Sequence, residues 1–256
     1  MGKTELLNEL FSLENKVGIV TGGSKGIGYE ISKVLAEAGA TVYSFSRQLP
    51  CKDKDQPIHN VNYIQTDVCH YDQTQDSIDE IIKKEGQLDF LVNNAGITIK
   101  NPAGDFSMND WESVHKTNVD AVFHLCKTCF PYLKESQTKG RIVNITSMAA
   151  HLGFTGVAPY CSSKSAVLGL TKALSVEWAK DNILVNSVAP GWIYTDMTKT
   201  VKDDDRIKKI LGRMTLHEFG QARDVAGMVL FLLGSASSYI TGQDFAVDGG
   251  ALSYGY

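Results

Sequence analysis

The sequence predicts an α/β fold in which a doubly wound, seven-stranded parallel sheet carries helices on both faces. Short apolar runs alternate along the chain with longer stretches of helical periodicity, which is the pattern of repeated βαβ units. A glycine-rich segment follows the first apolar run and opens the first helical stretch. No linker, internal repeat or low-complexity tract divides the 256 residues, so we expect a single domain over residues 1–256.

Continuous apolar runs bounded by turn residues locate the strands. Buried parallel strands show such runs because helices cover both of their faces. The expected strands are residues 17–20, 41–45, 62–65, 89–92, 141–145, 183–187 and 244–247.

Apolar residues spaced three and four apart predict helices between these strands. The expected helices are residues 26–38, 72–84, 111–133, 160–179 and 224–233. The segment 48–60 contains Pro50 and Pro57 and lacks this spacing, so we expect a loop in place of the second crossover helix. Residues 1–14 lead into the first strand, and the polar residues 199–212 predict a mobile helical insert.

Composition and charge exclude several classes of protein. Lys and Arg total 25 against 29 Asp and Glu, a formal net charge of −4, and no basic block is longer than Lys208-Lys209. We therefore expect no nucleic acid and no anionic membrane as a partner. No stretch has the roughly 20 apolar residues of a membrane span. The first residues lack a signal-peptide pattern, so a cytoplasmic location is expected.

The five cysteines are odd in number, which favours reduced thiols over a disulfide framework. Cys126 and Cys129 form a C-x-x-C pair, but zinc would need two further ligands at suitable spacing, and none lies nearby. We interpret both cysteines as core residues of a helix and expect no metal site.

The glycine-rich segment, residues 21–28, has the sequence Thr-Gly-Gly-Ser-Lys-Gly-Ile-Gly. Glycine lets the backbone turn tightly and approach a pyrophosphate, and the helix N-terminus that follows offers N–H donors to it. Such a segment can also be only a turn, but here it has the strand, turn and helix context that dinucleotide binding requires. The expected cofactor contacts are Gly22, Ser24, Lys25, Gly26, Ile27 and Gly28.

Further motifs follow the predicted strands in a fixed order. They are Asn93-Asn94-Ala95-Gly96, Asn118, Ser147, Tyr160-x-x-x-Lys164, Pro190-Gly191 with Thr195, and Asp248-Gly249-Gly250. Together with the glycine spacing, this series resembles the short-chain dehydrogenase/reductase family through nearly the whole chain. The resemblance implies a Rossmann fold, nicotinamide-dependent interconversion of ketones and alcohols, and a homotetramer, although the sequence alone leaves the oligomeric state open.

Most of these motifs fall beyond the carboxyl ends of strands, where ligands bind in open α/β sheets. The resemblance places the adenosine part of the cofactor against Asp67, Val68, Asn94, Ala95 and Gly96, and the nicotinamide part against Pro190, Gly191, Ile193 and Thr195. An acidic residue about 20 positions after the glycine loop normally selects NAD, and this chain has Ser46-Arg47 there. Arginine offers a planar fork of donors to a 2′-phosphate, and Lys25 could add a second charge. We therefore expect NADP(H), the alternative being that both cations are simply solvated.

Reduction of a ketone needs a proton for the developing alkoxide, and Tyr160 is the candidate acid. An unperturbed tyrosine pKa of about 10 is too high for efficient exchange at neutral pH. Lys164 follows four residues later on the same helix face, so its charge is expected to lower that pKa. The resemblance adds that Lys164 and Tyr160 also contact the cofactor and that Ser147 polarises the carbonyl. It further implies that Asn118 kinks its helix to hold a water of the proton relay.

The substrate pocket is expected to contain residues 149–151, 153–154 and 192–194 and the variable insert 196–213. His151 could line this pocket or be a solvated loop histidine. Ser147-Met148 and residues 177–180 are similar to the sugar and polyol branch of the family, such as gluconate 5-dehydrogenases and sorbose or xylulose reductases.

Two alternatives stay open. One is a 3-oxoacyl-thioester reductase, but such enzymes tend to carry a basic residue for an acidic carrier protein where this chain has Asp181. The other is a catalytically silent NADP-binding regulator, against which the presence of Ser147, Tyr160 and Lys164 counts.

Overall fold

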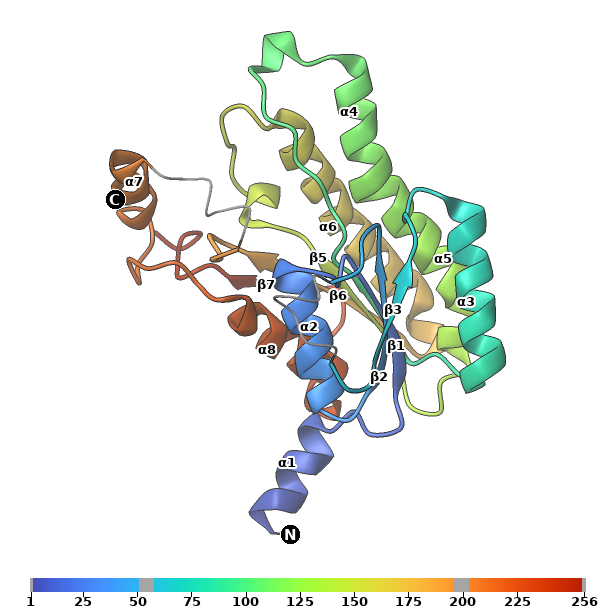
Figure 1. Ribbon diagram of the computed structural model, residues 1–256. Coiled ribbons are helices and arrows are strands. Elements are labelled where there is room, and N and C mark those ends of the chain that lie inside the picture. The colour runs from blue at the N-terminus through green and yellow to red at the C-terminus, as the bar shows by residue number, and fades with distance from the viewer. Residues whose placement is uncertain (1, 51–57, 196–202, 255–256) are drawn as a thin grey trace.

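The computed structural model describes residues 2–50, 58–195 and 203–254 (Figure 1). Seven strands form one fully parallel sheet in the order β3-β2-β1-β4-β5-β6-β7. They are β1 (Val17–Thr21), β2 (Thr41–Ser46), β3 (Val61–Gln65), β4 (Phe90–Asn93), β5 (Gly140–Ile145), β6 (Ile183–Pro190) and β7 (Asp244–Val247). The predicted doubly wound sheet is confirmed, and no strand boundary differs from the expected one by more than three residues.

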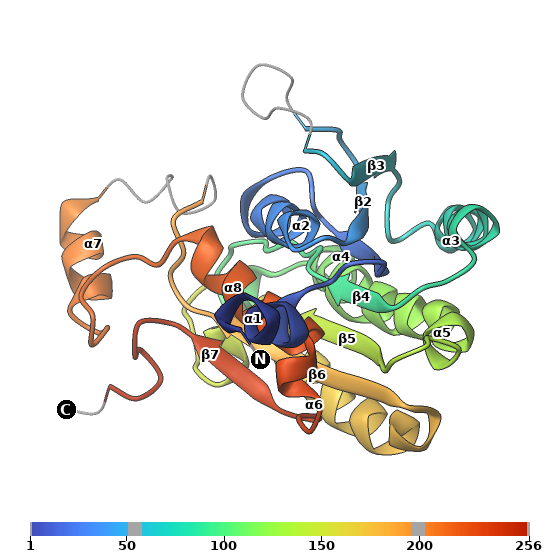
Figure 2. The same ribbon diagram turned by 90° about the horizontal axis from the view of Figure 1, so that it is seen from below.

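Helices cover both faces of the sheet (Figure 2). They are α1 (Lys3–Phe11), α2 (Gly26–Glu37), α3 (Tyr71–Glu85), α4 (Met108–His115), α5 (Ala121–Lys134), α6 (Ala158–Trp178), α7 (Asp204–Leu211) and α8 (Ala222–Leu233). The side chains of α2 and α8 belong to one buried apolar cluster, and those of α3, α5 and α6 belong to the other. Because apolar layers lie on both sides, every residue of β1, β5 and β6 is buried.

The helix expected over residues 111–133 is not a continuous α-helix. The chain instead forms α4 and α5 with a π-helical turn, Lys116–Asp120, between them. Asn118 lies in the middle of this turn and is fully buried. A π turn inserts an extra residue into the helix, a device found frequently at functional sites. The turn is the physical form of the kink expected at Asn118.

The remaining connections agree with the expectations as far as they are described. The expected loop 48–60 contains no helix in its described parts, residues 48–50 and 58–60. Residues 51–57, which include Pro57, lie outside the described residues. Residues 1–14 include α1, and α7 lies within the expected insert, of which 196–202 also lie outside the described residues. No helix in the described ranges is long and apolar enough to cross a membrane.

Candidate active site

The glycine segment forms the turn from β1 into α2, at the carboxyl edge of the sheet (Figure 1). Gly22 and Gly26 have φ angles of +68° and +58°, which side chains disfavour. A Cβ at Gly28 would lie 2.3 Å from the carbonyl oxygen of Gly22, so only glycine permits this approach. The backbone N–H of Ser24 donates to Ser46 Oγ at 3.1 Å, which ties the turn to the end of β2. Lys25 is exposed at the start of α2, and Ile27 packs on the core.

Thr21, which sequence reasoning did not single out, joins this turn to the loop after β4. Its hydroxyl accepts the backbone N–H groups of Asn94 and Ala95, both at 3.0 Å. The Asn94 side-chain amide donates to the Thr21 carbonyl at 2.9 Å. A Cβ at Gly96 would lie 3.3 Å from Asn118 Oδ1 and 3.6 Å from Lys164 Nζ, so this glycine leaves space beside both groups.

Two further groups of predicted contacts lie at the same edge. Arg47 is exposed after β2, and its carbonyl accepts from Gln65 Nε2 at 3.1 Å. After β3, Asp67 Oδ1 accepts the Cys69 N–H at 2.9 Å, and Val68 is buried. Asp67 therefore caps the turn that follows β3.

The segment after β6 approaches the glycine turn. The Gly191 N–H donates to the Val247 carbonyl at 2.9 Å, and a Cβ at Gly191 would lie 2.6 Å from Asp248 Cα. Ile193 is buried, and the methyl group of Thr195 lies 3.8 Å from the position of a Cβ at Gly26. The structure thus brings the predicted phosphate and nicotinamide segments close together.

The four predicted catalytic residues come from three parts of the chain. Ser147 follows β5, caps the short turn Met148–Ala150 and lies near Tyr160. On α6, the Lys164 ammonium donates to the Ile145 carbonyl at 2.7 Å and lies 5.7 Å from the centroid of the Tyr160 ring.

Asn118 is held by the backbone before it and by α6. Its side chain accepts the Ile97 N–H at 2.8 Å and donates to the Ile97 carbonyl at 2.9 Å. It also donates to Ser163 Oγ at 3.0 Å. The π turn is therefore fixed against the helix that carries Tyr160.

Burial dominates the electrostatics of Tyr160 and Lys164. It raises the pKa of Tyr160 above the ordinary value, and the neighbouring Ser147 hydroxyl opposes this rise. It lowers the pKa of Lys164 to about 8. The expectation of a lowered tyrosine pKa is therefore wrong for this structure, because removing the hydroxyl from water is the largest effect on it.

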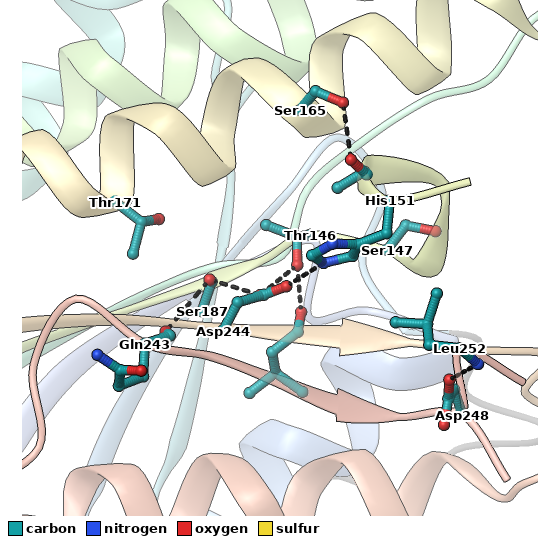
Figure 3. A network of polar contacts seen from close by, with 12 residues as sticks. Thr146, Ser147, His151, Ser165, Thr171, Ser187, Gln243, Asp244, Asp248 and Leu252 are labelled. Atoms are coloured by element: carbon teal, nitrogen blue, oxygen red, sulfur yellow. Dashed lines mark hydrogen bonds and ion pairs between the residues drawn. The ribbon is translucent and has the colours of Figure 1, made fainter. Parts of the chain in front are cut away.

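His151 is exposed, as a solvated loop histidine would be, but it also has a specific partner that neither alternative anticipated. Its Nε2 lies 2.6 Å from Asp244 Oδ2 on β7, and Asp244 also binds Thr146 and Ser187 (Figure 3). Sequence reasoning missed this network because 93 residues separate His151 from Asp244. Cys126 and Cys129 are core residues, as predicted, and the described residues include no group of three or more metal-ligating side chains suited to a metal ion.

The chain is similar to known proteins over nearly its whole length. A family model described as enoyl-(acyl carrier protein) reductase matches residues 22–251. The chain is 38% identical to the 2-dehydro-3-deoxy-D-gluconate 5-dehydrogenase of Bacillus subtilis, over 96% of this chain and 98% of that protein. It is 36% identical to the 3-oxoacyl-acyl-carrier-protein reductase of Chlamydia muridarum, over 93% and 98% of the two chains.

Solved structures give the same result. The gluconate 5-dehydrogenase from Burkholderia cenocepacia in complex with NADP and tartrate matches with a TM-score of 0.88 at 31% identity, over 96% of this chain and 98% of that one. The fold and the site define a nicotinamide-dependent oxidoreductase of the Rossmann type. The chain belongs to the short-chain dehydrogenase/reductase family, as its motifs predicted.

The buried cation at Lys164 leads to a stability prediction. No carboxylate lies within salt-bridge distance of its ammonium in the part of the chain that the structure describes. Lys164→Met replaces this cation by an apolar side chain of similar length, so the free energy of unfolding at pH 7 should rise by about 1–3 kcal/mol.

The gain should depend on pH. With a pKa of about 8 when folded, against the ordinary 10.5, Lys164 makes the parent more stable as pH rises from 8 to 10.5. The variant lacks this rise, so its advantage should shrink over that range. Denaturant unfolding at several pH values measures the difference, with Lys172→Met, an exposed position on α6, as the control. An advantage that does not change with pH would contradict the prediction.

Proposed function

We propose that this protein is an NADP(H)-dependent oxidoreductase that interconverts a ketone and a secondary alcohol on a sugar-acid or polyol-like substrate. The observation that carries the proposal is the proximity of Tyr160 to Ser147 and to the buried ammonium of Lys164, which lies 5.7 Å from the centroid of the tyrosine ring. A protonated tyrosine paired with a second hydroxyl is suited to deliver a proton to a carbonyl oxygen.

In the reductive direction, Tyr160 gives its hydroxyl proton to the carbonyl oxygen while Ser147 donates a hydrogen bond to the same oxygen. The raised pKa keeps Tyr160 protonated at neutral pH, which is the form this step needs. Lys164 stabilises the tyrosinate that remains. A nicotinamide bound in this site would supply the hydride for the carbonyl carbon. We assign Asn118 to the return of the proton, since its turn is bonded to α6 beside Tyr160.

The residues at the carboxyl edge fit a dinucleotide. The left-handed glycines and the start of α2 form a cradle that side chains would fill. Gly96 keeps open the space beside Lys164 Nζ, whose ammonium has three donors. The Ile145 carbonyl takes one of them, so the others suit ribose hydroxyls. We retain all the cofactor contacts predicted from the sequence and assign a 2′-phosphate to Lys25 and Arg47, both exposed. The NADP in the Burkholderia cenocepacia structure supports this choice.

The substrate assignment rests on relatives named for sugar acids. The alternative of a 3-oxoacyl-thioester reductase has support from the Chlamydia muridarum relative. Asp181 counts against it, because this carboxylate binds Lys134 at 2.8 Å and so neutralises one of the cations that an acidic carrier protein would need.

We also propose a cytoplasmic homotetramer with one domain per chain, in which residues 196–213 form the variable substrate-side insert. The helices α4 and α5 support the assembly, because Trp111 and Phe123 are 37% and 48% exposed there. Sedimentation velocity tests this: a particle of four chains is expected, and a monomer would contradict it.

The cofactor choice predicts the effect of Arg47→Ala. Loss of a charged donor to the 2′-phosphate should cost about 2 kcal/mol, or roughly 30-fold in kcat/KM for NADPH. The value for NADH should change little, since NADH has no phosphate at that position. Steady-state kinetics with both cofactors measure this, with Lys83→Ala on the exposed face of α3 as the control. An equal loss for both cofactors would overturn the assignment.

The substrate choice predicts the outcome of a panel assay. NADPH oxidation should be faster with 5-keto sugar acids and ketoses than with acetoacetyl thioesters. Tyr160→Phe should lose turnover of the whole panel while NADPH binding, followed by fluorescence, stays measurable. Preference for the thioester would favour the acyl reductase, and tight NADPH binding with no turnover of any carbonyl would favour the silent regulator.

A further inference from the structure

A buried carboxylate lies at the start of β7. Asp244 Oδ1 accepts the hydroxyls of Thr146 at 2.8 Å and Ser187 at 2.6 Å, and Oδ2 lies 2.6 Å from His151 Nε2 (Figure 3). Its side chain is 8% exposed, against 35% for His151. Three donors thus converge on one carboxylate from outside its own strand.

Two of these donors stand on either side of Ser147. Thr146 directly precedes it, and His151 follows the turn Met148–Ala150 that Ser147 caps. Within the turn, the Ala149 N–H donates to Ser147 Oγ at 3.1 Å. From α6, Ser165 Oγ donates to the Ala150 carbonyl at 3.0 Å. The segment 146–151 is therefore tied at both ends to β7 and in its middle to the helix that carries Tyr160.

The carboxylate is costly without these partners. The other residues of β7 are Phe245, Ala246 and Val247, and a buried carboxylate on such a strand must be fully hydrogen-bonded to be tolerated. Loss of His151 leaves Oδ2 without its donor, whereas loss of Ser187 leaves Thr146 on Oδ1. The two losses also differ in position, because His151 belongs to the segment that carries Ser147, whereas Ser187 lies on β6.

We propose that Asp244 and His151 are positioning residues, which hold the Ser147 hydroxyl in register with Tyr160 by clamping both ends of the segment 146–151. The inference rests on the proposed function, in which the Ser147 hydroxyl must be held in place to donate a hydrogen bond to the carbonyl oxygen of the substrate. A reacting group must keep its hydrogen-bond geometry with the substrate oxygen, because small displacements of the group lower the reaction rate strongly.

The first test is kinetic. His151→Leu should lower kcat about tenfold with little change in KM for NADPH, because the change misplaces a hydroxyl and leaves the cofactor cradle intact. His151→Gln should restore most of kcat, since its amide can donate to Asp244 Oδ2. The matched control is Ser187→Ala, which removes a donor from the same carboxylate at β6 and should stay within about twofold of the parent.

The second test does not depend on turnover. Backbone amide exchange should rise about tenfold at Ala149, Ala150 and His151 in His151→Leu, and should be unchanged in His151→Gln and Ser187→Ala. If the parent reduces no carbonyl, the proposed function fails, but this exchange pattern still supports the clamp. The clamp is overturned if His151→Leu keeps the parent's exchange rates. It is also overturned if Ser187→Ala loses as much kcat as His151→Leu, since the effect would then be general destabilisation.

Discussion

The parallel arrangement of all seven strands is the constraint on which the rest of the structure depends. Because every strand ends at the same edge, segments far apart in the sequence meet there through short loops. The Thr21 hydroxyl at the end of β1 accepts the N–H groups of Asn94 and Ala95 after β4. The Ile145 carbonyl at the end of β5 accepts the ammonium of Lys164 from α6. The strand ends therefore bind the loops and the Lys164 ammonium of the candidate site directly.

Burial shifts the pKa values of Tyr160 and Lys164, and it also lowers the stability of the fold at the buried cation. A surrounding of low polarity favours the neutral form of each group, so the pKa of Tyr160 rises and that of Lys164 falls to about 8. At neutral pH the tyrosine is then a proton donor, while the lysine still carries most of its charge. The same burial places a cation where an apolar side chain would be more stable, so readiness for chemistry and stability of the fold are opposed at this position.

The parts that sequence reasoning could predict are those with local signals. The strands could be predicted because burial on both faces leaves apolar runs. The proximity of Tyr160 and Lys164 could be predicted because they lie four residues apart on one helix, whereas Ser147 was singled out through the family resemblance. The π turn has no such signal, since the apolar spacing of residues 111–133 fits an α-helix equally well. The predicted direction of the Tyr160 pKa shift was wrong, because a spacing of four residues indicates that Lys164 is close but does not indicate how deeply the hydroxyl is buried. The hydrogen bond between His151 and Asp244 had no local signal, because it depends on the strand order β5-β6-β7. That order brings β7, with Asp244, near the segment after β5 that contains His151.

The proposed catalytic residues and the residues that surround the substrate are different residues, which explains why proteins of one family carry names for different substrates. In the proposed reaction, Ser147, Tyr160 and Lys164 act on a carbonyl group and leave the rest of the substrate to other residues, so they define the reaction and not its substrate. Identities of 38% and 36% to proteins named for a sugar acid and for an acyl thioester are too similar to decide between them. Discrimination has to come from the walls of the pocket, and residues 149–151 are expected to form one of them. Since Asp244 clamps the segment that contains both this wall and Ser147, a change at the clamp should alter the choice of substrate together with the rate.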